Sequence, residues 1–331
     1  DAVGIGEAED IWEEMLEDAA NGRLKPIYRA RRVEDLSGLP FPRYDLLELR
    51  RYGLFKTFSV QSSRGCPFKC YFCSERFYLG QAYRYRPVED VVEEIKRTGG
   101  KIILFADSNF AGKRAHALEL MEALIPLRLR WSALWSVDLC RNREFMDVAQ
   151  RSGLLHVNIG IESIDQDTLS GMNKRTNKVD QYRDILVDLR RRGISYSLNF
   201  IFGADTEKED VFRATMAFLQ ENKVPVAYFN ILTPHRGTPL YDRMKQDGRL
   251  LDDYNMGRWP GMTCYIKPRN VSPEELECRV KELYKGFYTF PSMLARLPPP
   301  VTQASIASWV VNWSQRRMAH SHTPMENFDD Y

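Results

Sequence analysis

The chain has 331 residues, of which 47 are basic and 45 acidic, so its formal net charge is only +2. Hydrophobic residues make up 44% and charged residues 28%, which is typical of a globular protein with one large domain or two smaller ones. This balance gives no electrostatic reason to expect nucleic acid or an anionic membrane surface as a partner. We also expect no transmembrane segment, because no apolar run reaches the ~18 residues that cross a bilayer.

The sequence opens in the middle of a structural pattern. Residues 2–9 are predicted to be the end of a buried strand and a turn, and residues 10–20 a helix. No partner for this strand is predicted, so we expect the chain to be a fragment of a longer protein. Residues 21–56 have little periodicity and contain three prolines, which is typical of a connector.

Short apolar runs alternate with amphipathic segments from residue 57 onward. Strands are predicted over residues 57–62, 101–106, 129–137, 154–161, 194–202 and 226–232. Helices are predicted between them over residues 87–97, 113–125, 143–151, 179–192 and 208–221. Strict alternation favours a parallel sheet with helices outside, as an open doubly wound sheet or as a barrel. Active sites on such barrels lie at the carboxyl ends of the strands.

The pattern changes after about residue 265. Two further helices are predicted over residues 272–290 and 302–318, and the last dozen polar residues are expected to fray. Three cysteines, Cys140, Cys264 and Cys278, are scattered along the chain, as free thiols in a reducing compartment would be. We therefore expect a cytoplasmic protein.

The most informative motif follows the strand predicted over residues 57–62. Cys66, Cys70 and Cys73 have the spacing C-x3-C-x2-C. Three thiolates can hold three irons of a 4Fe–4S cluster and leave the fourth iron open to a substrate or a second cofactor. The alternatives are a zinc knuckle or three unrelated buried cysteines. Zinc would need a fourth Cys or His, and the nearest histidine in the sequence is His116.

The motif, together with Phe72 just before the last cysteine, resembles the signature of the radical S-adenosylmethionine (SAM) superfamily. The resemblance implies that the open iron binds the amino and carboxylate groups of SAM. It also implies that the reduced cluster cleaves SAM to a 5′-deoxyadenosyl radical, and that Phe72 lies beside the adenine. The implied fold is α/β: a partial, TIM-like (β/α)6 barrel with the cysteine loop after its first strand.

Two strand ends carry candidate SAM contacts. After the second barrel strand, where this superfamily binds the SAM amino group, Asp107 supplies a carboxylate and is followed by Ser108. The alternative for both residues is ordinary turn chemistry. Glu162 and Ser163 end the fourth strand, and the SAM ribose or ammonium would pair the Glu162 carboxylate. A structural salt bridge with an arginine is the alternative for Glu162.

The remaining candidates lie at the ends of the fifth and sixth strands. Gly203 would allow the backbone to approach a cofactor closely. His235, in a turn rich in proline and glycine, is a weaker candidate for a proton donor or substrate contact. A lone loop histidine is more often simply exposed.

Several segments also resemble the subgroup of radical SAM proteins that has a cobalamin-binding domain before the barrel. They are residues 5–9, 39–43, 106–110, 160–163, 233–240 and 248–250. The resemblance implies that residues 1–20 are the tail of a Rossmann-like cobalamin domain, 21–56 a connector, 57–265 the radical SAM core and 266–331 a helical extension. The Asp-x-His-x-x-Gly motif that ligates cobalamin does not occur in this sequence.

The resemblance implies a radical SAM methyltransferase that moves a methyl group from cobalamin to an unactivated carbon. The implied partners are a small apolar substrate, such as a lipid, a tetrapyrrole or a natural-product scaffold, and an electron donor such as flavodoxin or ferredoxin. One alternative is a radical SAM cyclase, oxidoreductase or carbon–sulfur bond-forming enzyme without methyl transfer. A more remote alternative is a non-catalytic Fe–S protein, which a complete set of four cysteine ligands would support.

Overall fold

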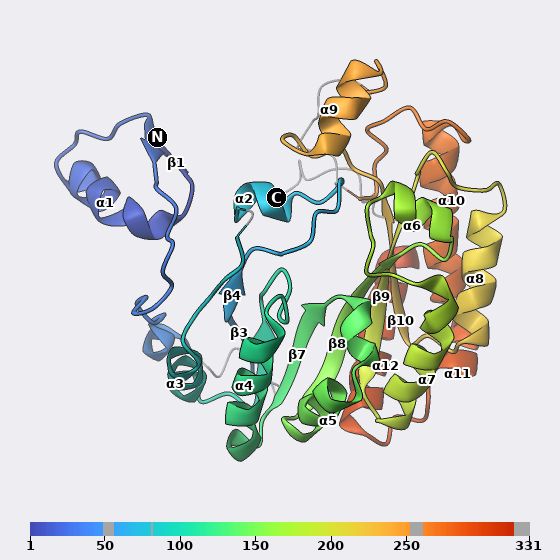
Figure 1. Ribbon diagram of the computed structural model, residues 1–331, viewed down its shortest axis with the longest axis horizontal. Helices are drawn as coiled ribbons and strands as arrows, with labels where there is room; N and C mark the ends of the chain where they lie inside the picture. Colours follow the sequence, from blue (N-terminus) through green and yellow to red (C-terminus); the bar gives the residue numbers. More distant parts are fainter. Residues whose placement is uncertain (49–55, 81, 252–260, 321–331) are drawn as a thin grey trace.

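The structure is a computed structural model that describes residues 1–48, 56–80, 82–251 and 261–320 (Figure 1). Its centre is a parallel sheet of six strands in the order β3-β6-β7-β8-β9-β10. The strands are β3 (Thr57–Val60), β6 (Ile102–Phe105), β7 (Arg130–Trp135), β8 (Leu154–Glu162), β9 (Ser195–Phe202) and β10 (Val226–Ile231). Each strand lies beside the next one in sequence, which is the order of a barrel and not of a doubly wound sheet. The prediction of a partial (β/α)6 barrel is confirmed, with β3 and β10 as its edges.

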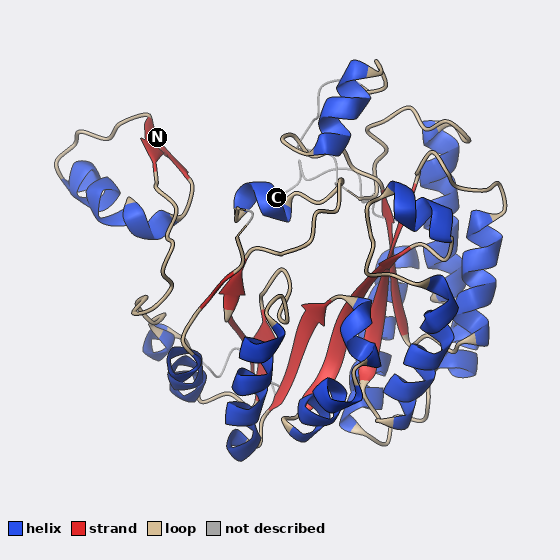
Figure 2. Ribbon diagram, in the orientation of Figure 1, coloured by secondary structure: helices blue, strands red, loops and turns tan. Residues whose placement is uncertain are grey.

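Helices cover the outer face of this sheet (Figure 2). Those between the strands are α3 (Val88–Thr98), α4 (Arg114–Leu124), α5 (Arg143–Arg151), α6 (Gln166–Gly171), α7 (Tyr182–Arg191) and α8 (Val211–Glu221), with short 3-10 turns at Ile125–Leu127, Val137–Arg141 and Val179–Gln181. Helix α3 illustrates why they form: Val91 and Ile95 are one turn apart and buried, and Gly99 ends the helix in the left-handed conformation, with φ 62°.

The core beneath α4 and α5 is built from aromatic rings. Trp131 and Trp135 are fully buried, and their ring centroids are 6.1 Å apart. Phe110 packs 5.1 Å from Trp131, and Phe145 of α5 packs edge-on against Trp135 at 5.4 Å. This packing fixes the outer face of β7 and leaves the inner face of the barrel for the site.

The N-terminal segment forms a small unit at the side of the barrel (Figure 1). Strand β1 (Val3–Ile5) pairs in parallel with β2 (Ile27–Arg29), and α1 (Trp12–Ala20) connects them. Two expectations are therefore wrong: β1 has a partner within the chain, and it is exposed, with Val3 57% and Ile5 41% accessible. The partner was missed because a strand of three residues has too little periodicity to separate it from a connector. Turns at Ala8–Asp10 and Tyr44–Leu46 complete this region.

The C-terminal part is helical, as predicted, and contains α10 (Pro273–Phe287), α11 (Phe290–Arg296) and α12 (Gln303–His320). Helix α9 (Pro239–Gln246), before this part, was not predicted. The helix predicted over residues 272–290 is divided, because the Thr289 side chain caps a new helix by accepting a hydrogen bond from Ser292 N–H. The final residues that were expected to fray, 321–331, lie outside the described residues. Within the described ranges, every helix is too short or too polar to span a bilayer.

Candidate active site

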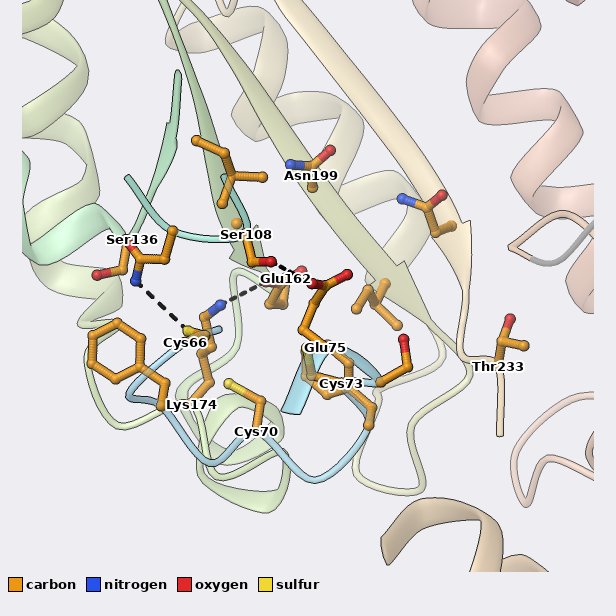
Figure 3. Close-up of a pocket in the computed structure, with 18 of the residues that line it drawn as sticks. Cys66, Cys70, Cys73, Glu75, Ser108, Ser136, Glu162, Lys174, Asn199 and Thr233 are labelled. Carbon is orange, nitrogen blue, oxygen red and sulfur yellow. Dashed lines mark hydrogen bonds and ion pairs between the residues drawn. The ribbon is translucent and has the colours of Figure 1, made fainter. Parts of the chain in front are cut away.

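A cavity of about 420 Å³ lies where the carboxyl ends of the barrel strands meet the cysteine loop (Figure 3). The loop contributes one wall and the strand ends the other. Cys66, Cys70, Cys73 and Phe72 line it from the loop, and Ser108, Glu162 and His235 line it from the strand side. The structure thus brings together seven of the residues predicted for the site.

The cysteine loop is closed at its base by a short antiparallel ladder. Strand β4 (Ser63–Arg64) pairs with β5 (Arg84–Tyr85), and α2 (Glu75–Tyr78) lies within the loop. Gly65 has φ 86°, and a Cβ there would lie 2.6 Å from the Ala82 carbonyl oxygen, so only glycine fits. Asn173, after α6, donates a hydrogen bond to the Lys69 carbonyl at 2.7 Å. The loop is therefore held at its base and near its middle.

The three cysteines are free thiols on one cavity wall. Burial raises the pKa of Cys70, and it raises the pKa of Cys73 to about 11. Such thiols become thiolates only when a cationic group or metal stabilises the negative charge. Among the described residues, no three His, Cys, Asp or Glu side chains converge as the ligands of one metal ion do. Three cysteines are enough to hold a 4Fe–4S cluster with one open iron, whereas a structural zinc site needs four protein ligands.

Glu162 faces the cavity and is paired with Lys174, which lies after α6 (Figure 3). The two side chains are 7% and 12% exposed, and Lys174 Nζ is 2.8 Å from Glu162 Oε1. Burial alone would lower the pKa of Lys174, but the neighbouring Glu162 carboxylate holds it above its usual value. The backbone of Glu162 has a φ of 63°, next to a shift in the pairing register of β8 and β9. Gly160 has no side chain, and the Glu162 and Lys174 side chains fill the space where a Cβ would lie.

Asp107 does not reach the cavity. Its carboxylate accepts hydrogen bonds from the backbone N–H groups of Ser62 and Ser63 at 2.8 and 2.9 Å, and from the Ser62 hydroxyl. Burial raises the pKa of Asp107 to about 6. The expectation that Asp107 contacts SAM is therefore not supported, because its oxygens hold the chain between β3 and the cysteine loop. The neighbouring Ser108 does line the cavity and donates a hydrogen bond to the Glu75 carboxylate.

Ser163 and Gly203 are also placed away from the cavity lining. The Ser163 hydroxyl accepts a hydrogen bond from Asp165 N–H at 3.0 Å, which shapes the turn before α6. Gly203 has φ 103°, and a Cβ there would lie 2.9 Å from Leu276 of α10. The close approach predicted at Gly203 is thus made by a packing side chain. His235 lines the cavity, and its burial lowers the pKa of the imidazole, which favours the neutral ring.

The structure adds lining residues that the sequence did not predict. Asn109 donates a side-chain N–H to the Cys66 sulfur at 3.7 Å, and Asn199 and Asn230 line the barrel interior. A signal for the last two was present, because each is an amide side chain with an apolar residue on either side of it in its strand. Nothing in the sequence indicates Lys174, because its partner Glu162 lies 12 residues away across a turn and a short helix.

A parallel barrel with three thiols at the carboxyl ends of its strands defines a class of enzyme that binds a cluster at the barrel mouth. Residues 60–219 match the family model of the Radical SAM superfamily. The chain belongs to this superfamily and is a radical SAM enzyme, a class that uses a 4Fe–4S cluster and SAM.

The chain aligns with curated relatives over most of its length. The bacteriochlorophyllide d C-12(1)-methyltransferase of Chlorobaculum tepidum is 28% identical over 338 residues, which cover 98% of this chain and 71% of that protein. The anaerobic magnesium-protoporphyrin IX monomethyl ester cyclase of Cereibacter sphaeroides is 28% identical over 235 residues, which cover 68% of this chain and 38% of the cyclase.

The fold is similar to that of the radical SAM methyltransferase TsrM from Kitasatospora setae. The TsrM structure with tryptophan and a SAM analogue aligns with a TM-score of 0.63 at 18% identity, covering 95% of this chain and 75% of TsrM. A second TsrM structure, with cobalamin and a 4Fe–4S cluster bound, aligns with a TM-score of 0.56 at 22% identity, covering 88% and 55%. At these identities the likeness is one of fold.

Proposed function

We propose that Cys66, Cys70 and Cys73 hold a 4Fe–4S cluster whose open iron faces the cavity, and that SAM binds there. One observation carries this proposal: the three thiols line the same cavity as the buried Glu162–Lys174 pair. When bound and reduced, the cluster supplies the electron that cleaves SAM to methionine and a 5′-deoxyadenosyl radical. The protein's task is to hold SAM in one orientation and to keep water away from the radical.

The polar groups in the cavity match the methionine part of SAM, which carries both an amino group and a carboxylate. Lys174 offers a cation to the carboxylate, and Glu162 offers a hydrogen-bond acceptor to the amino group. Phe72 supplies an apolar ring for the adenine, and Ser108 lies on the strand side of the cavity. A buried ion pair that exchanges partners with a zwitterionic ligand avoids leaving either charge unpaired.

Replacement of Lys174 tests this assignment. Because Arg keeps the charge, Lys174→Arg is expected to bind SAM within about threefold of wild type, whereas Lys174→Met is expected to weaken binding at least tenfold. The measurement is equilibrium binding of SAM to the anaerobic, cluster-loaded protein. Equal affinities of the Met and Arg variants would contradict a charged contact to the SAM carboxylate.

We further infer that the reaction is methylation of an unactivated carbon with cobalamin as the methyl donor. Support comes from the relative named as a bacteriochlorophyllide methyltransferase and from a fold neighbour that binds cobalamin. The substrate would be a small, largely apolar molecule such as a tetrapyrrole, a lipid or a natural-product scaffold. Electrons would come from a flavodoxin or ferredoxin. The free cysteines and an oxygen-labile cluster favour the cytoplasm.

The proposed division of the chain follows from this function. Residues 1–20 would be the tail of a cobalamin-binding domain, 21–56 a connector, 57–265 the radical SAM core and 266–331 a helical extension. The short parallel pair β1–β2 with exposed apolar side chains supports a further α/β layer beside it.

A second candidate function is a radical cyclisation or oxidation without methyl transfer, which the similarity to a tetrapyrrole cyclase favours. Product analysis separates the two. Anaerobic reactions with SAM, reductant and a bacteriochlorophyllide, with and without cobalamin, are expected to yield 5′-deoxyadenosine, plus S-adenosylhomocysteine only when cobalamin is present. Cobalamin-independent turnover without S-adenosylhomocysteine would favour the cyclase-type reaction. Membership of the superfamily leaves the non-catalytic Fe–S protein without support.

A further inference from the structure

Two arginines face each other at the base of the cysteine loop. In the β4–β5 ladder, Arg64 is directly opposite Arg84, and their side chains are only 13% and 5% exposed. Like charges directly opposite on paired strands destabilise the pair, and burial increases the penalty because water no longer screens the charges. The ladder therefore needs an anion to form.

Glu7 of the N-terminal segment supplies that anion. Its Oε2 lies 2.8 Å from Arg84 Nη1 and 3.2 Å from Arg64 Nη1, so one carboxylate bridges both guanidinium groups. Glu9 forms a second ion pair with Arg64, and Val33 N–H donates a hydrogen bond to Glu7 at 3.1 Å. Burial alone would raise the pKa of Glu7, but Arg84, Val33 N–H and Arg64 hold it below its usual value. Glu7 is thus ionised at neutral pH.

The same N-terminal region also contacts the returning arm of the loop. Arg84 donates to the Leu79 carbonyl at 2.8 Å and to the Val33 carbonyl, and Arg32 donates to the Ala82 carbonyl at 3.1 Å. Arg64 lies two residues before Cys66, at the start of the loop. The contacts therefore join the outgoing and returning arms of the cysteine loop through a segment that precedes the barrel by some 50 residues in sequence.

We propose that Glu7, assisted by Glu9, is a positioning residue for the cluster-bearing loop. By neutralising Arg64 and Arg84, it keeps the base of the loop closed, so that retention of the cluster depends on the seating of the N-terminal segment. This inference rests on the proposed cluster site. It makes the N-terminal unit a part of that site, although it supplies no ligand.

Hydrogen exchange of the cluster-free protein tests the closure itself. In Glu7→Gln, the backbone amides of residues 63–66 and 82–86 are expected to exchange at least tenfold faster than in wild type, whereas amides of β8 and β9 stay unchanged. The control is Glu13→Gln, an exposed glutamate on α1 of the same segment. Equal exchange in the Glu7 and Glu13 variants would overturn the proposal. Glu9→Gln removes only one ion pair and should give a smaller increase in the same amides.

A double variant separates charge neutralisation from ordinary packing. In Glu7→Gln/Arg64→Gln only Arg84 remains, so the repulsion between the two arginines is gone. Exchange at the loop base is therefore expected to return at least halfway to the wild-type rate on a logarithmic scale. If Glu7 acted only as a hydrogen-bond acceptor, the double variant would exchange as fast as Glu7→Gln or faster. That result would overturn the neutralisation argument.

Iron retention distinguishes this inference from the proposed function. After anaerobic reconstitution, Glu7→Gln is expected to lose iron to a chelator at least fivefold faster than wild type and Glu13→Gln. If wild type itself takes up no iron, the proposed cluster site fails. If wild type holds four irons and Glu7→Gln loses them at the wild-type rate, the cluster site stands and the positioning role of Glu7 is overturned.

Discussion

Asn109 shows how a single residue can adjust the site without being a ligand. Its amide N–H is directed at the Cys66 sulfur, 3.7 Å away, from the turn that follows β6. A hydrogen bond to a cluster thiolate withdraws negative charge from the sulfur and makes reduction easier. The reduction potential of a cluster held by Cys66 would therefore depend on Asn109, a residue that the sequence analysis did not select.

Asn109→Ala is expected to lower the reduction potential of the cluster. A hydrogen bond worth about 1 kcal/mol corresponds to roughly 40 mV for a one-electron couple. The measurement is a redox titration followed by electron paramagnetic resonance. Asn199→Ala, which changes a cavity residue away from the thiols, is the control and should leave the potential unchanged. A shift of the same size in both variants would contradict the assignment.

A local motif was enough to predict which residues line the cavity, whereas contacts between residues far apart in the sequence could not be predicted. The cysteine spacing and the glutamate ending β8 were visible in the sequence, and all four residues line the cavity. Asp107 was misread because its partners are backbone N–H groups 44 and 45 residues earlier, which no side-chain pattern marks. Glu7 and Arg64 are 57 residues apart, so no local pattern in the sequence links them either.

At the scale of elements, the carboxyl end of β9 is held by a buried acid. Glu207 accepts a hydrogen bond from Gly203 N–H at 2.8 Å, while its other oxygen is buried without a partner among the described residues. Burial raises the pKa of Glu207 to about 7. Ionising this carboxyl therefore costs stability where β9 leaves the barrel towards α8.

The pH dependence of stability tests this view of Glu207. Because its pKa is raised in the folded state, its contribution is full below pH 4.5 and is lost as the pH rises through about 7. Glu207→Gln cannot ionise, so it is expected to be more stable than wild type at pH 8, by on the order of 2 kcal/mol, and to match it near pH 4.5. Urea unfolding across this range is the measurement, with the exposed Glu209→Gln as control. A parallel profile for Glu207→Gln and wild type would refute the argument.

Helices and strands were predicted well wherever burial produces a clear pattern of apolar residues in the sequence. The barrel strands were predicted to within two residues at each end, because buried parallel strands have continuous apolar runs. Strand β2 was missed and the break between α10 and α11 was not foreseen. Both depend on very short segments, where a single pairing or one capping threonine decides the structure.

For the whole molecule, one buried arginine joins the barrel to its C-terminal helices. Arg296 of α11 is 3% exposed and donates to the carbonyls of Val224 and Pro225 before β10, at 2.6 and 3.0 Å. It also donates to the Phe287 carbonyl and to Asn312 of α12. Burial lowers the pKa of Arg296 to about 10. Helices α11 and α12 are therefore tied to the barrel through this side chain.

Arg296→Met is expected to lower the free energy of unfolding by about 3 kcal/mol, because it leaves several buried acceptors without donors. Hydrogen exchange in α12 should increase as well. The matched control is Arg317→Met, which replaces an exposed arginine on α12. It should change the free energy of unfolding by less than about 0.5 kcal/mol. If both variants are equally stable, α11 and α12 are not tied to the barrel in this way.

The overall fold could be predicted because two features of the sequence agree. The strand–helix alternation fits either a doubly wound sheet or a barrel, and the family that the cysteine motif resembles has the barrel. The arrangement of the polar site could not be predicted, because it depends on which distant charges the barrel brings together. Lys174 lies against Glu162 in the folded chain, where the neighbouring Asn173 is bonded to the cysteine loop.

Reductive cleavage of SAM is the most direct test of the account. The anaerobic, iron- and sulfide-reconstituted protein is incubated with SAM and dithionite, and 5′-deoxyadenosine is quantified by mass spectrometry. Wild type is expected to form it, whereas Cys66→Ala, Cys70→Ala and Cys73→Ala should form less than a hundredth as much, and Cys278→Ala, at an exposed cysteine, should match wild type. Formation of 5′-deoxyadenosine by the variants of the three loop cysteines, or its absence from wild type holding an intact cluster, would contradict the central claim.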